Sequence, residues 1–258
     1  MKQILLVGCG NLGKAFLKAW SQNSEIQQIK VIQPSLSAQN VFSTSPQISF
    51  YAHADGLPTD FKPDVVVLAF KPYHLEEGIK ALERFFSEVC FVSLLAGVSM
   101  QKLKACSGSD TRWVRIMPNV AAEMGQSANL AFGARGECEA LFVSTGPLFW
   151  MPTESLFDSM TAISGCGPAY FYLMAEIMAH VAVQLGLEQK TADSLVKQTL
   201  LGSASLLKPE TAFKDLRNSV TSKGGMTEAA LSVLGAPLRQ SLEQAIHAAL
   251  KRMIKIPQ

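Results

Sequence analysis

The 258-residue sequence is 48% hydrophobic and 17% charged, with a formal net charge of +2. This composition predicts a globular protein, long enough for one large domain or two modest ones, and it excludes a disordered chain. No long run of Lys or Arg occurs, so we expect no nucleic-acid partner and no membrane partner. The expected partners are small molecules.

The chain has five cysteines, an odd number with no C-x-x-C spacing: Cys9, Cys90, Cys106, Cys138 and Cys166. This pattern argues against a disulfide framework and against a zinc site, and predicts reduced thiols in a cytoplasmic protein. The first apolar run reaches glycine after only a few residues. It is therefore too short for a signal peptide or a membrane span.

A glycine-rich turn is the first motif of the chain. Residues 3–7 predict a strand and residues 14–20 a helix, and between them lies Gly8-Cys9-Gly10-Asn11-Leu12-Gly13. In a G-x-G-x-x-G turn the first glycine bends the chain, the second lets the backbone approach a pyrophosphate, and the third allows close helix–strand packing. We therefore predict a dinucleotide site, with a plain strand–helix turn as the alternative.

The residues after the second expected strand, 29–33, bear on the choice of nicotinamide cofactor. An NAD enzyme usually has Asp or Glu here for the ribose 2′-hydroxyl, whereas this chain has Gln33-Pro34-Ser35. No carboxylate would repel a 2′-phosphate and Ser35 can donate to it, although the usual arginine is missing and Lys30 is the only basic residue nearby. The sequence favours NADPH, with NADH also possible.

Apolar runs at residues 64–70 and 89–94, separated by a helical segment at 75–86, lack polar alternation and predict buried parallel strands. A further apolar run covers residues 113–117, and short strands at 130–133 and 148–151 are expected to close the sheet. The strand ends at 69–72 and 96–97 fall on the same sheet edge as the glycine turn, where ligands bind in such sheets. Lys71 at this edge is either a functional lysine or a solvated one.

After about Pro152 the segments have helical periodicity, and we expect helices at 156–163, 169–185, 189–207, 211–218, 228–233 and 238–254. The segment 169–185 is apolar nearly all round, which predicts a helix that is central to a domain or buried in a subunit interface. About a hundred residues of such helices suggest an obligate oligomer. The expected fold is an α/β Rossmann-type doubly wound sheet followed by an all-helical C-terminal domain. Its domains are an NAD(P)-binding domain, residues 1–153, and a helical dimerisation and substrate-binding domain, residues 154–258.

Residues 219–231, S-V-T-S-K-G-G-M-T-E-A-A-L, form the second motif. Gly224 and Gly225 precede Thr227, Glu228 and an apolar run, a pattern typical of a loop that bends sharply into the first turn of a helix. Backbone N–H groups and the helix dipole at such a start attract an anion, so the loop could hold a small carboxylate. A well-capped helix start without a ligand is the alternative.

Other chemistries have little support. The first half of the chain contains no His-x-x-His, no paired carboxylates and no G-x-S-x-G. All four histidines are interpreted as structural or solvated: His53, His74, His180 and His247. The sequence therefore argues against a serine hydrolase and against a metalloenzyme, and we expect no metal.

Five segments in register over nearly the whole chain resemble the pyrroline-5-carboxylate reductase family. They are residues 8–13, A-F-K-P at 69–72, R-I-M-P-N at 115–119, S-G-C-G-P-A-Y at 164–170 and V-T-S-K-G-G-M-T at 220–227. The resemblance implies NAD(P)H-dependent reduction of 1-pyrroline-5-carboxylate to L-proline, the last step of proline biosynthesis. It also implies an interlocked homodimer and, in some members, higher assemblies of dimers.

Site residues follow from the resemblance by position. The dinucleotide is expected to contact Gly8, Cys9, Gly10, Asn11, Leu12, Gly13, Ser35, Ala69, Lys71, Pro72, Ala96 and Gly97. The substrate is expected to contact Ser164, Gly167, Pro168, Glu210 of the partner subunit, Val220, Thr221, Ser222, Gly224, Gly225 and Thr227. A protonated cyclic imine accepts hydride directly, so the enzyme needs alignment and a hydrogen-bonding group at nitrogen, for which we expect Thr227.

The chain departs from the family pattern at several positions. Lys223 stands where the family usually has proline, and Met226 stands where it has Thr or Ala. Cys166 replaces the common serine, and Val120-Ala121 replaces the usual Thr-Pro. Because two of these departures lie in the substrate loop, a non-catalytic NADP-binding sensor or scaffold stays open as an alternative. A β-hydroxyacid dehydrogenase is less favoured, because the segment 169–185 lacks the lysine that such an enzyme carries.

Overall fold

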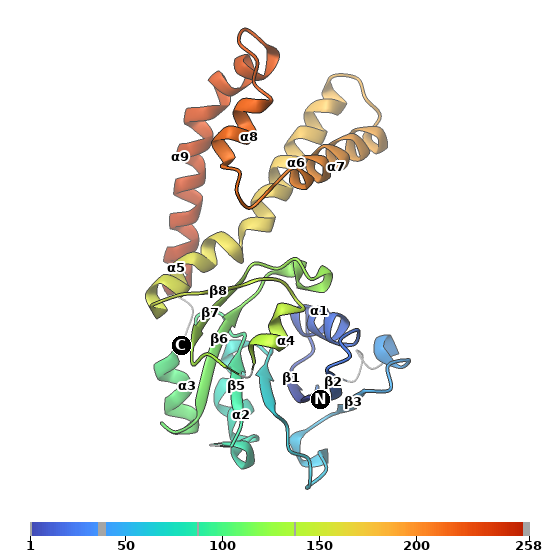
Figure 1. Cartoon of the computed structure of the whole chain (residues 1–258), viewed down its shortest axis with the longest axis vertical. Helices are drawn as coiled ribbons and strands as arrows, with labels where there is room; N and C mark the ends of the chain where they lie inside the picture. The colour runs from blue at the N-terminus through green and yellow to red at the C-terminus, as the bar shows by residue number, and fades with distance from the viewer. Residues whose placement is uncertain (1, 36–39, 87, 137, 255–258) are drawn as a thin grey trace. The chain divides into compact units, whose positions relative to one another are not determined.

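The computed structural model describes residues 2–35, 40–86, 88–136 and 138–254. The chain divides into two compact units. Met1–Cys166 with Leu250–Gln258 form the first, called the sheet unit here, and Gly167–Ala249 form the second, called the helical unit. Figure 1 shows the elements of both units.

The sheet unit contains one eight-stranded sheet in the order β3-β2-β1-β4-β5-β6-β7-β8. Its strands are β1 Lys2–Val7, β2 Ile26–Ile32, β3 Ile48–Tyr51, β4 Val65–Leu68, β5 Cys90–Ser93, β6 Arg112–Met117, β7 Asn129–Gly133 and β8 Leu148–Trp150. Neighbouring strands are parallel except β6 and β7. The strand order reverses between β1 and β4, so the predicted doubly wound Rossmann sheet is confirmed.

Two features of the sheet were not predicted from the sequence. The first is the edge strand β3, I-S-F-Y; it has four residues and pairs with β2, and so short a run carries a weak periodic signal. The second is the direction of β7, the expected strand at 130–133, which runs antiparallel to β6. Periodicity finds a strand and does not give its direction.

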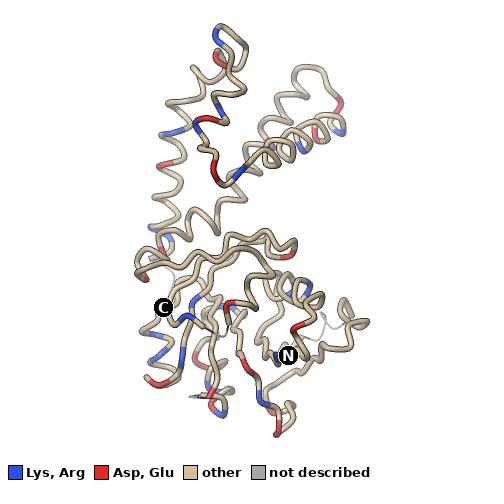
Figure 2. The backbone as a smooth tube through the Cα atoms, viewed as in Figure 1, with Lys and Arg blue, Asp and Glu red and all other residues tan. Residues whose placement is uncertain are grey.

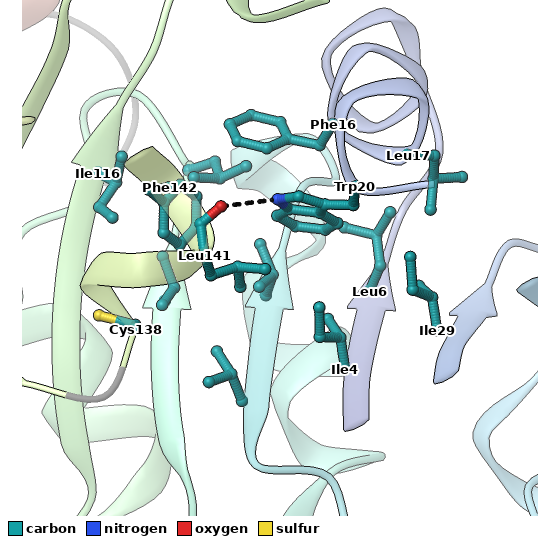
Figure 3. Close-up of a cluster of buried hydrophobic side chains, with 14 of the residues drawn as sticks. Ile4, Leu6, Phe16, Leu17, Trp20, Ile29, Ile116, Cys138, Leu141 and Phe142 are labelled. Carbon is teal, nitrogen blue, oxygen red and sulfur yellow. Dashed lines mark hydrogen bonds between the residues drawn. The ribbon is translucent and has the colours of Figure 1, made fainter. Parts of the chain in front are cut away.

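One face of the sheet packs against α1 Asn11–Trp20 and the short helix α4 Glu139–Val143 (Figure 3). The rings of Phe16, Trp20 and Phe142 lie 5.0 to 5.9 Å apart between centroids. The indole N–H of Trp20 donates a 3.0 Å hydrogen bond to the Leu141 carbonyl. Each aromatic pair contributes about 0.5 to 1.5 kcal/mol beyond area burial, so this cluster fixes the helix that follows the glycine turn.

The opposite face packs against α2 Leu75–Lys80 and α3 Met100–Ser107. The helical segment expected at 75–86 is shorter than predicted, because α2 ends at Lys80 and a separate turn, η4, covers Glu83–Phe85. Neither α3 nor α4 was predicted. The start of α3 does have a local signal, since Ser99 caps it by accepting a hydrogen bond from the Lys102 N–H.

The last helix of the sheet unit is α5 Glu154–Ser164, close to the helix expected at 156–163. Thr153 caps its start by accepting a hydrogen bond from the Leu156 N–H at 3.2 Å. Phe157 of α5 is buried in a small cluster with Met117 and Leu130, against which Ala96 and Met160 also pack. Helix α5 thus lies against β7 and the end of β6.

The helical unit begins with α6 Gly167–Gln184, α7 Gln189–Ser205 and α8 Phe213–Ser219. The two helices expected at 228–233 and 238–254 are one helix, α9 Met226–Ile254, with Pro237 inside it. Proline removes one backbone hydrogen bond and kinks a helix. The helix can still continue through the proline when the turns on both sides keep their own backbone hydrogen bonds. The sequence prediction that the helix is interrupted between residues 233 and 238 was wrong.

The helical unit leaves most of its apolar side chains exposed. In α6 only Gly167 and Ala179 are buried, whereas Phe171, Tyr172 and Leu173 are 60%, 61% and 56% exposed. Glu176 is the only Asp, Glu, Lys or Arg of this helix (Figure 2). By length and composition the stretch Glu154–Gln184 also passes a test for a membrane span, a weak indication because apolar helices of other kinds pass it too.

Candidate active site

The glycine turn joins three elements at the carboxyl edge of the sheet. Gly8 follows β1 with φ of 96°, and a Cβ added there would lie 2.7 Å from the Ala69 carbonyl carbon and the Phe70 nitrogen. A Cβ on Gly13 would lie 2.6 Å from the Gly8 carbonyl oxygen. Both positions therefore require glycine, because the start of α1 packs on the turn and the turn packs on the end of β4.

The same turn is open on its outer side. A Cβ added to Gly10 would meet nothing within 4 Å. Gly10 is the N-cap of α1, has no side-chain cap, and is followed by a first turn without acidic residues. The first helical bond runs from the Lys14 N–H to the Gly10 carbonyl at 2.9 Å, so the preceding N–H groups have no partner within the helix. This start fits a dinucleotide pyrophosphate.

Gln33, just after β2, is tied to the turn. Its side-chain Oε1 accepts a 2.6 Å hydrogen bond from the Cys9 N–H, and its own N–H donates to the Tyr51 carbonyl. Burial raises the pKa of the Cys9 thiol to about 11, although Lys14 acts in the opposite direction. The thiol is therefore neutral at physiological pH, and neither side chain adds negative charge beside the proposed phosphate position. Sequence reasoning missed this contact of Gln33.

The other predicted cofactor residues lie at the same edge of the sheet. Ala69 follows β4 and donates its N–H to the Val7 carbonyl at 2.7 Å. The exposed Lys71 comes immediately before the turn η3 Pro72–His74. Ala96 and Gly97 follow β5, and Gly97 has φ of 76°. Ser35 is exposed, three residues beyond the end of β2.

Asn119, two residues beyond β6, is a second residue that sequence reasoning did not place in the site. Its side-chain Nδ2 donates a 2.9 Å hydrogen bond to the carbonyl of Ser164, a predicted substrate residue at the end of α5. Its Oδ1 accepts a hydrogen bond from the Ala121 N–H, also at 2.9 Å. The R-I-M-P-N motif could have pointed to this residue, but nothing local in the sequence indicates its partner.

The predicted substrate loop lies in the helical unit, between α8 and α9. Gly224 has φ of 71°, and its N–H donates a 2.7 Å hydrogen bond to Glu228 Oε2. The Gly225 N–H donates to the Ser222 carbonyl at 3.0 Å. A Cβ on Gly225 would lie 2.4 Å from Ser222 Oγ. The first glycine thus supplies the left-handed turn, and the second lets the loop close tightly before the helix.

The start of α9 keeps its donors available. The first helical bond runs from the Ala229 N–H to the Gly225 carbonyl. Within the part of the chain that the structure describes, the N–H groups of Met226, Thr227 and Glu228 donate no hydrogen bond. The side chain of Thr227 is exposed. A helix start with free N–H groups and a neighbouring hydroxyl can hold a carboxylate and bond a second polar atom.

The remaining predicted substrate residues are spread over the helical unit. Gly167 and Pro168 begin α6, and Glu210 lies in the exposed turn between α7 and α8. Among the residues that the structure describes, no hydrogen bond or ion pair joins Glu210 or the start of α6 to the loop 220–227. The same described residues contain no group of three or more His, Cys, Asp or Glu that could hold a metal ion.

The sheet topology and the open glycine turn define a Rossmann-type dinucleotide-binding oxidoreductase. A sequence model described as oxidoreductase family, NAD-binding Rossmann fold, matches residues 2–91. A second one, described as pyrroline-5-carboxylate reductase dimerisation, matches residues 154–256 and supports dimer formation.

Similar proteins cover the whole chain. A pyrroline-5-carboxylate reductase of Haemophilus influenzae is 34% identical over 97% of this chain and 96% of its own. The pyrroline-5-carboxylate reductase of Pseudomonas aeruginosa is 31% identical over 98% of this chain and 96% of its own. The solved structure of a pyrroline-5-carboxylate reductase from Coxiella burnetii superposes with a TM-score of 0.89 at 30% identity. The superposition covers 100% of this chain and 99% of that one. The chain belongs to the pyrroline-5-carboxylate reductase family.

Proposed function

We propose that this protein reduces 1-pyrroline-5-carboxylate to L-proline with NADPH, the last step of proline biosynthesis. The observation that carries the proposal is the loop before α9. In a chain of this family, it combines donors for a small carboxylate with an exposed hydroxyl. NADPH is the proposed cofactor, with NADH as a possible substitute.

The cofactor site is the carboxyl edge of the sheet. The N–H groups at the start of α1 bind the pyrophosphate, and Gly10 leaves room for it. Ser35 and the neutral Gln33 leave a site for a 2′-phosphate, which an acidic residue there would repel. Ala96 and Gly97 adjoin the nicotinamide. When bound there, NADPH supplies the hydride. A solved relative from Plasmodium falciparum has NADP bound.

The residues of the substrate loop hold and orient a cyclic imine. The turn at Gly224 and Gly225 presents the free N–H groups of the first turn of α9, and these bind the carboxylate of the imine. The Thr227 hydroxyl hydrogen-bonds the ring nitrogen. The imine reacts in its protonated form: as its carbon gains hydride, the π electron pair of the C=N bond moves to the nitrogen, which already carries a proton, so the neutral amine forms while Thr227 keeps its hydrogen bond to the nitrogen. The catalysis is mainly positioning, without a covalent nucleophile.

We propose a homodimer whose interface covers the apolar side chains of α6, and further assembly of these dimers. The exposure of Phe171, Tyr172 and Leu173 supports this, because water solvates such a surface poorly and a second copy would bury it. In that dimer Glu210 serves the partner's substrate site. The functional boundary lies between residues 153 and 154, where the dimerisation match begins.

The surroundings proposed for the enzyme are the cytoplasm, without a membrane or nucleic-acid partner. None of the five cysteines, all of which the structure describes, is in a disulfide, and this supports the proposal, as does the biosynthetic role of the family.

The experiment that tests the proposal is oxidation of NADPH by the purified protein, followed by absorbance, with and without pyrroline carboxylate. We expect oxidation that depends on the substrate and forms proline in equal amount. Tight binding of NADPH without substrate-dependent oxidation would contradict the proposal and favour a cofactor-binding sensor or scaffold. A 3-hydroxy acid with NADP⁺ serves as the control substrate and is expected to give no reaction.

A further inference from the structure

Strand β6 and its continuation carry two polar side chains that hold α5. The first is Arg115, which is buried in the middle of the strand. Its Nη1 lies 2.5 Å from Glu154 Oε1 and its Nη2 2.8 Å from Asp158 Oδ1. The guanidinium also lies 4.5 Å from the centroid of the Phe157 ring. These contacts attach the first two turns of α5 to the sheet.

The second side chain is Asn119, which binds the other end of the same helix. Ser164 is the last residue of α5, so its carbonyl is one of those that have no partner inside the helix. Asn119 Nδ2 supplies that partner at 2.9 Å. Asn119 is itself fixed, since its N–H donates to Ser127 Oγ at 2.8 Å and its Oδ1 accepts from the Ala121 N–H.

The spacing of these contacts fits a helix laid along the strand. Four residues from Arg115 to Asn119 span roughly 13 Å of extended chain. Ten residues from Glu154 to Ser164 span roughly 15 Å of helix. Between the two ends, Phe157 packs with Met117 and against Ala96, the residue proposed to adjoin the nicotinamide. The helix is therefore attached at both ends beside the cofactor edge.

We propose that Asn119 is a positioning residue, which sets the place of Ser164, a predicted substrate residue, relative to the cofactor edge of the sheet. The inference rests on the proposed function and deepens it. Hydride transfer requires the reacting atoms at about 3 to 3.5 Å, and a displacement of about 1 Å costs about a hundredfold in rate. Asn119 acts through Ser164, and none of its hydrogen bonds to described residues is with the glycine turn.

The first test is Asn119→Ala, which removes both side-chain hydrogen bonds. We expect kcat/KM for pyrroline carboxylate to fall about ten- to a hundredfold, mainly through kcat. The dissociation constant of NADPH, measured by fluorescence, should change less than about twofold, because the pyrophosphate site is on β1 and α1. An equal loss of NADPH affinity and of turnover would overturn the positioning role, since it would place Asn119 in the cofactor site.

The second test is Asn119→Asp, which separates the two hydrogen bonds. The new carboxylate can still accept from the Ala121 N–H, but it faces the Ser164 carbonyl at the negative end of α5. We expect a larger loss than for Asn119→Ala at neutral pH. Lowering the pH to about 5 protonates a fraction of the side-chain carboxyl groups introduced by Asn119→Asp and restores a hydrogen-bond donor. The ratio of variant to wild-type activity, measured at the same pH, should therefore rise as the pH falls.

The charged groups near this position are already paired. Glu123, on the adjoining turn η5 Val120–Met124, forms an ion pair with Lys18 of α1. Glu154 and Asp158 on α5 pair with Arg115. A pH-independent activity ratio for Asn119→Asp would overturn the assignment of the Nδ2 donor.

The matched control is Thr153→Ala, which removes the cap at the opposite end of the same helix. We expect the melting temperature to fall as for Asn119→Ala, while kcat/KM stays within about twofold of wild type. If the Asn119 variants lose no more activity than Thr153→Ala, the positioning role is wrong and the proposed function stands. If wild type itself does not turn over pyrroline carboxylate, the proposed function fails, and this role with it.

Discussion

Glu228 Oε2 accepts a 2.7 Å hydrogen bond from the backbone N–H of Gly224. The carboxylate reaches back from the first turn of α9 over the loop that is proposed to bind the substrate carboxylate. It therefore occupies one of the donors in that loop and adds a negative charge beside the others. Glu228 both caps the helix and opposes an anionic substrate.

Replacing Glu228 by Gln is predicted to lower KM for pyrroline carboxylate about two- to fivefold. The amide oxygen can still accept from the Gly224 N–H, while a charge–charge repulsion of about 0.5 to 1 kcal/mol is removed. Steady-state kinetics at low and high salt measure this difference in KM between the variant and wild type. The difference should be smaller at high salt, because salt screens the repulsion. Glu228→Ala is the control; it removes the cap as well and should lower the melting temperature. A higher KM for Glu228→Gln would mean that the carboxylate assists binding.

Ser35→Asp is predicted to reverse the cofactor preference from NADPH to NADH. A carboxylate at this position repels the 2′-phosphate and can bond the free ribose hydroxyl. The dissociation constants of both cofactors, measured for wild type and variant, give the ratio directly. An unchanged ratio would show that the 2′-phosphate binds elsewhere.

Sedimentation experiments at micromolar protein concentration are predicted to detect no monomer. Leu173→Arg, which places a charge on the exposed apolar surface of α6, should shift the protein toward monomer and reduce kcat at least tenfold, because a charge is costly to bury in an interface. Val143→Arg is the matched control, since Val143 is 61% exposed on the sheet unit. An active monomer would contradict both the interface and the role of Glu210.

Thr227→Ala is predicted to lower kcat/KM about ten- to 150-fold, since a hydrogen bond to a charged group contributes roughly 1.5 to 3 kcal/mol. The affinity for NADPH should barely change. Thr227→Ser keeps the hydroxyl and should retain most of the activity. If Thr227→Ala is fully active, or loses cofactor and substrate binding equally, Thr227 has no role at the ring nitrogen and serves only the start of the helix.

Local features of the sequence predicted the fold and the positions of the main motifs. Gly8 and Gly13 could be assigned from sequence because each is required by its own immediate surroundings, a tight turn and a close helix contact. Pro237 misled the prediction because a proline weakens one turn of a helix, whereas the flanking turns of α9 decide whether the helix continues.

The contacts that the sequence did not predict join residues far apart in the chain. Gln33 binds the Cys9 N–H across 24 residues, and Asn119 binds the Ser164 carbonyl across 45. In both cases a side-chain amide finds a backbone group that only the folded sheet brings near it. Periodicity and turn chemistry describe neighbours in sequence, so they carry no information on such pairs.

The most direct test of the central claim follows the transferred hydrogen. Purified protein is incubated with pyrroline carboxylate and NADPH that carries deuterium at C4 of the nicotinamide on one or the other face, and the product is analysed by mass spectrometry. We predict that one of the two labelled cofactors gives proline with one deuterium at C5, the former imine carbon, as expected for direct hydride transfer. Proline without deuterium from both cofactors, or no proline at all, would contradict the account.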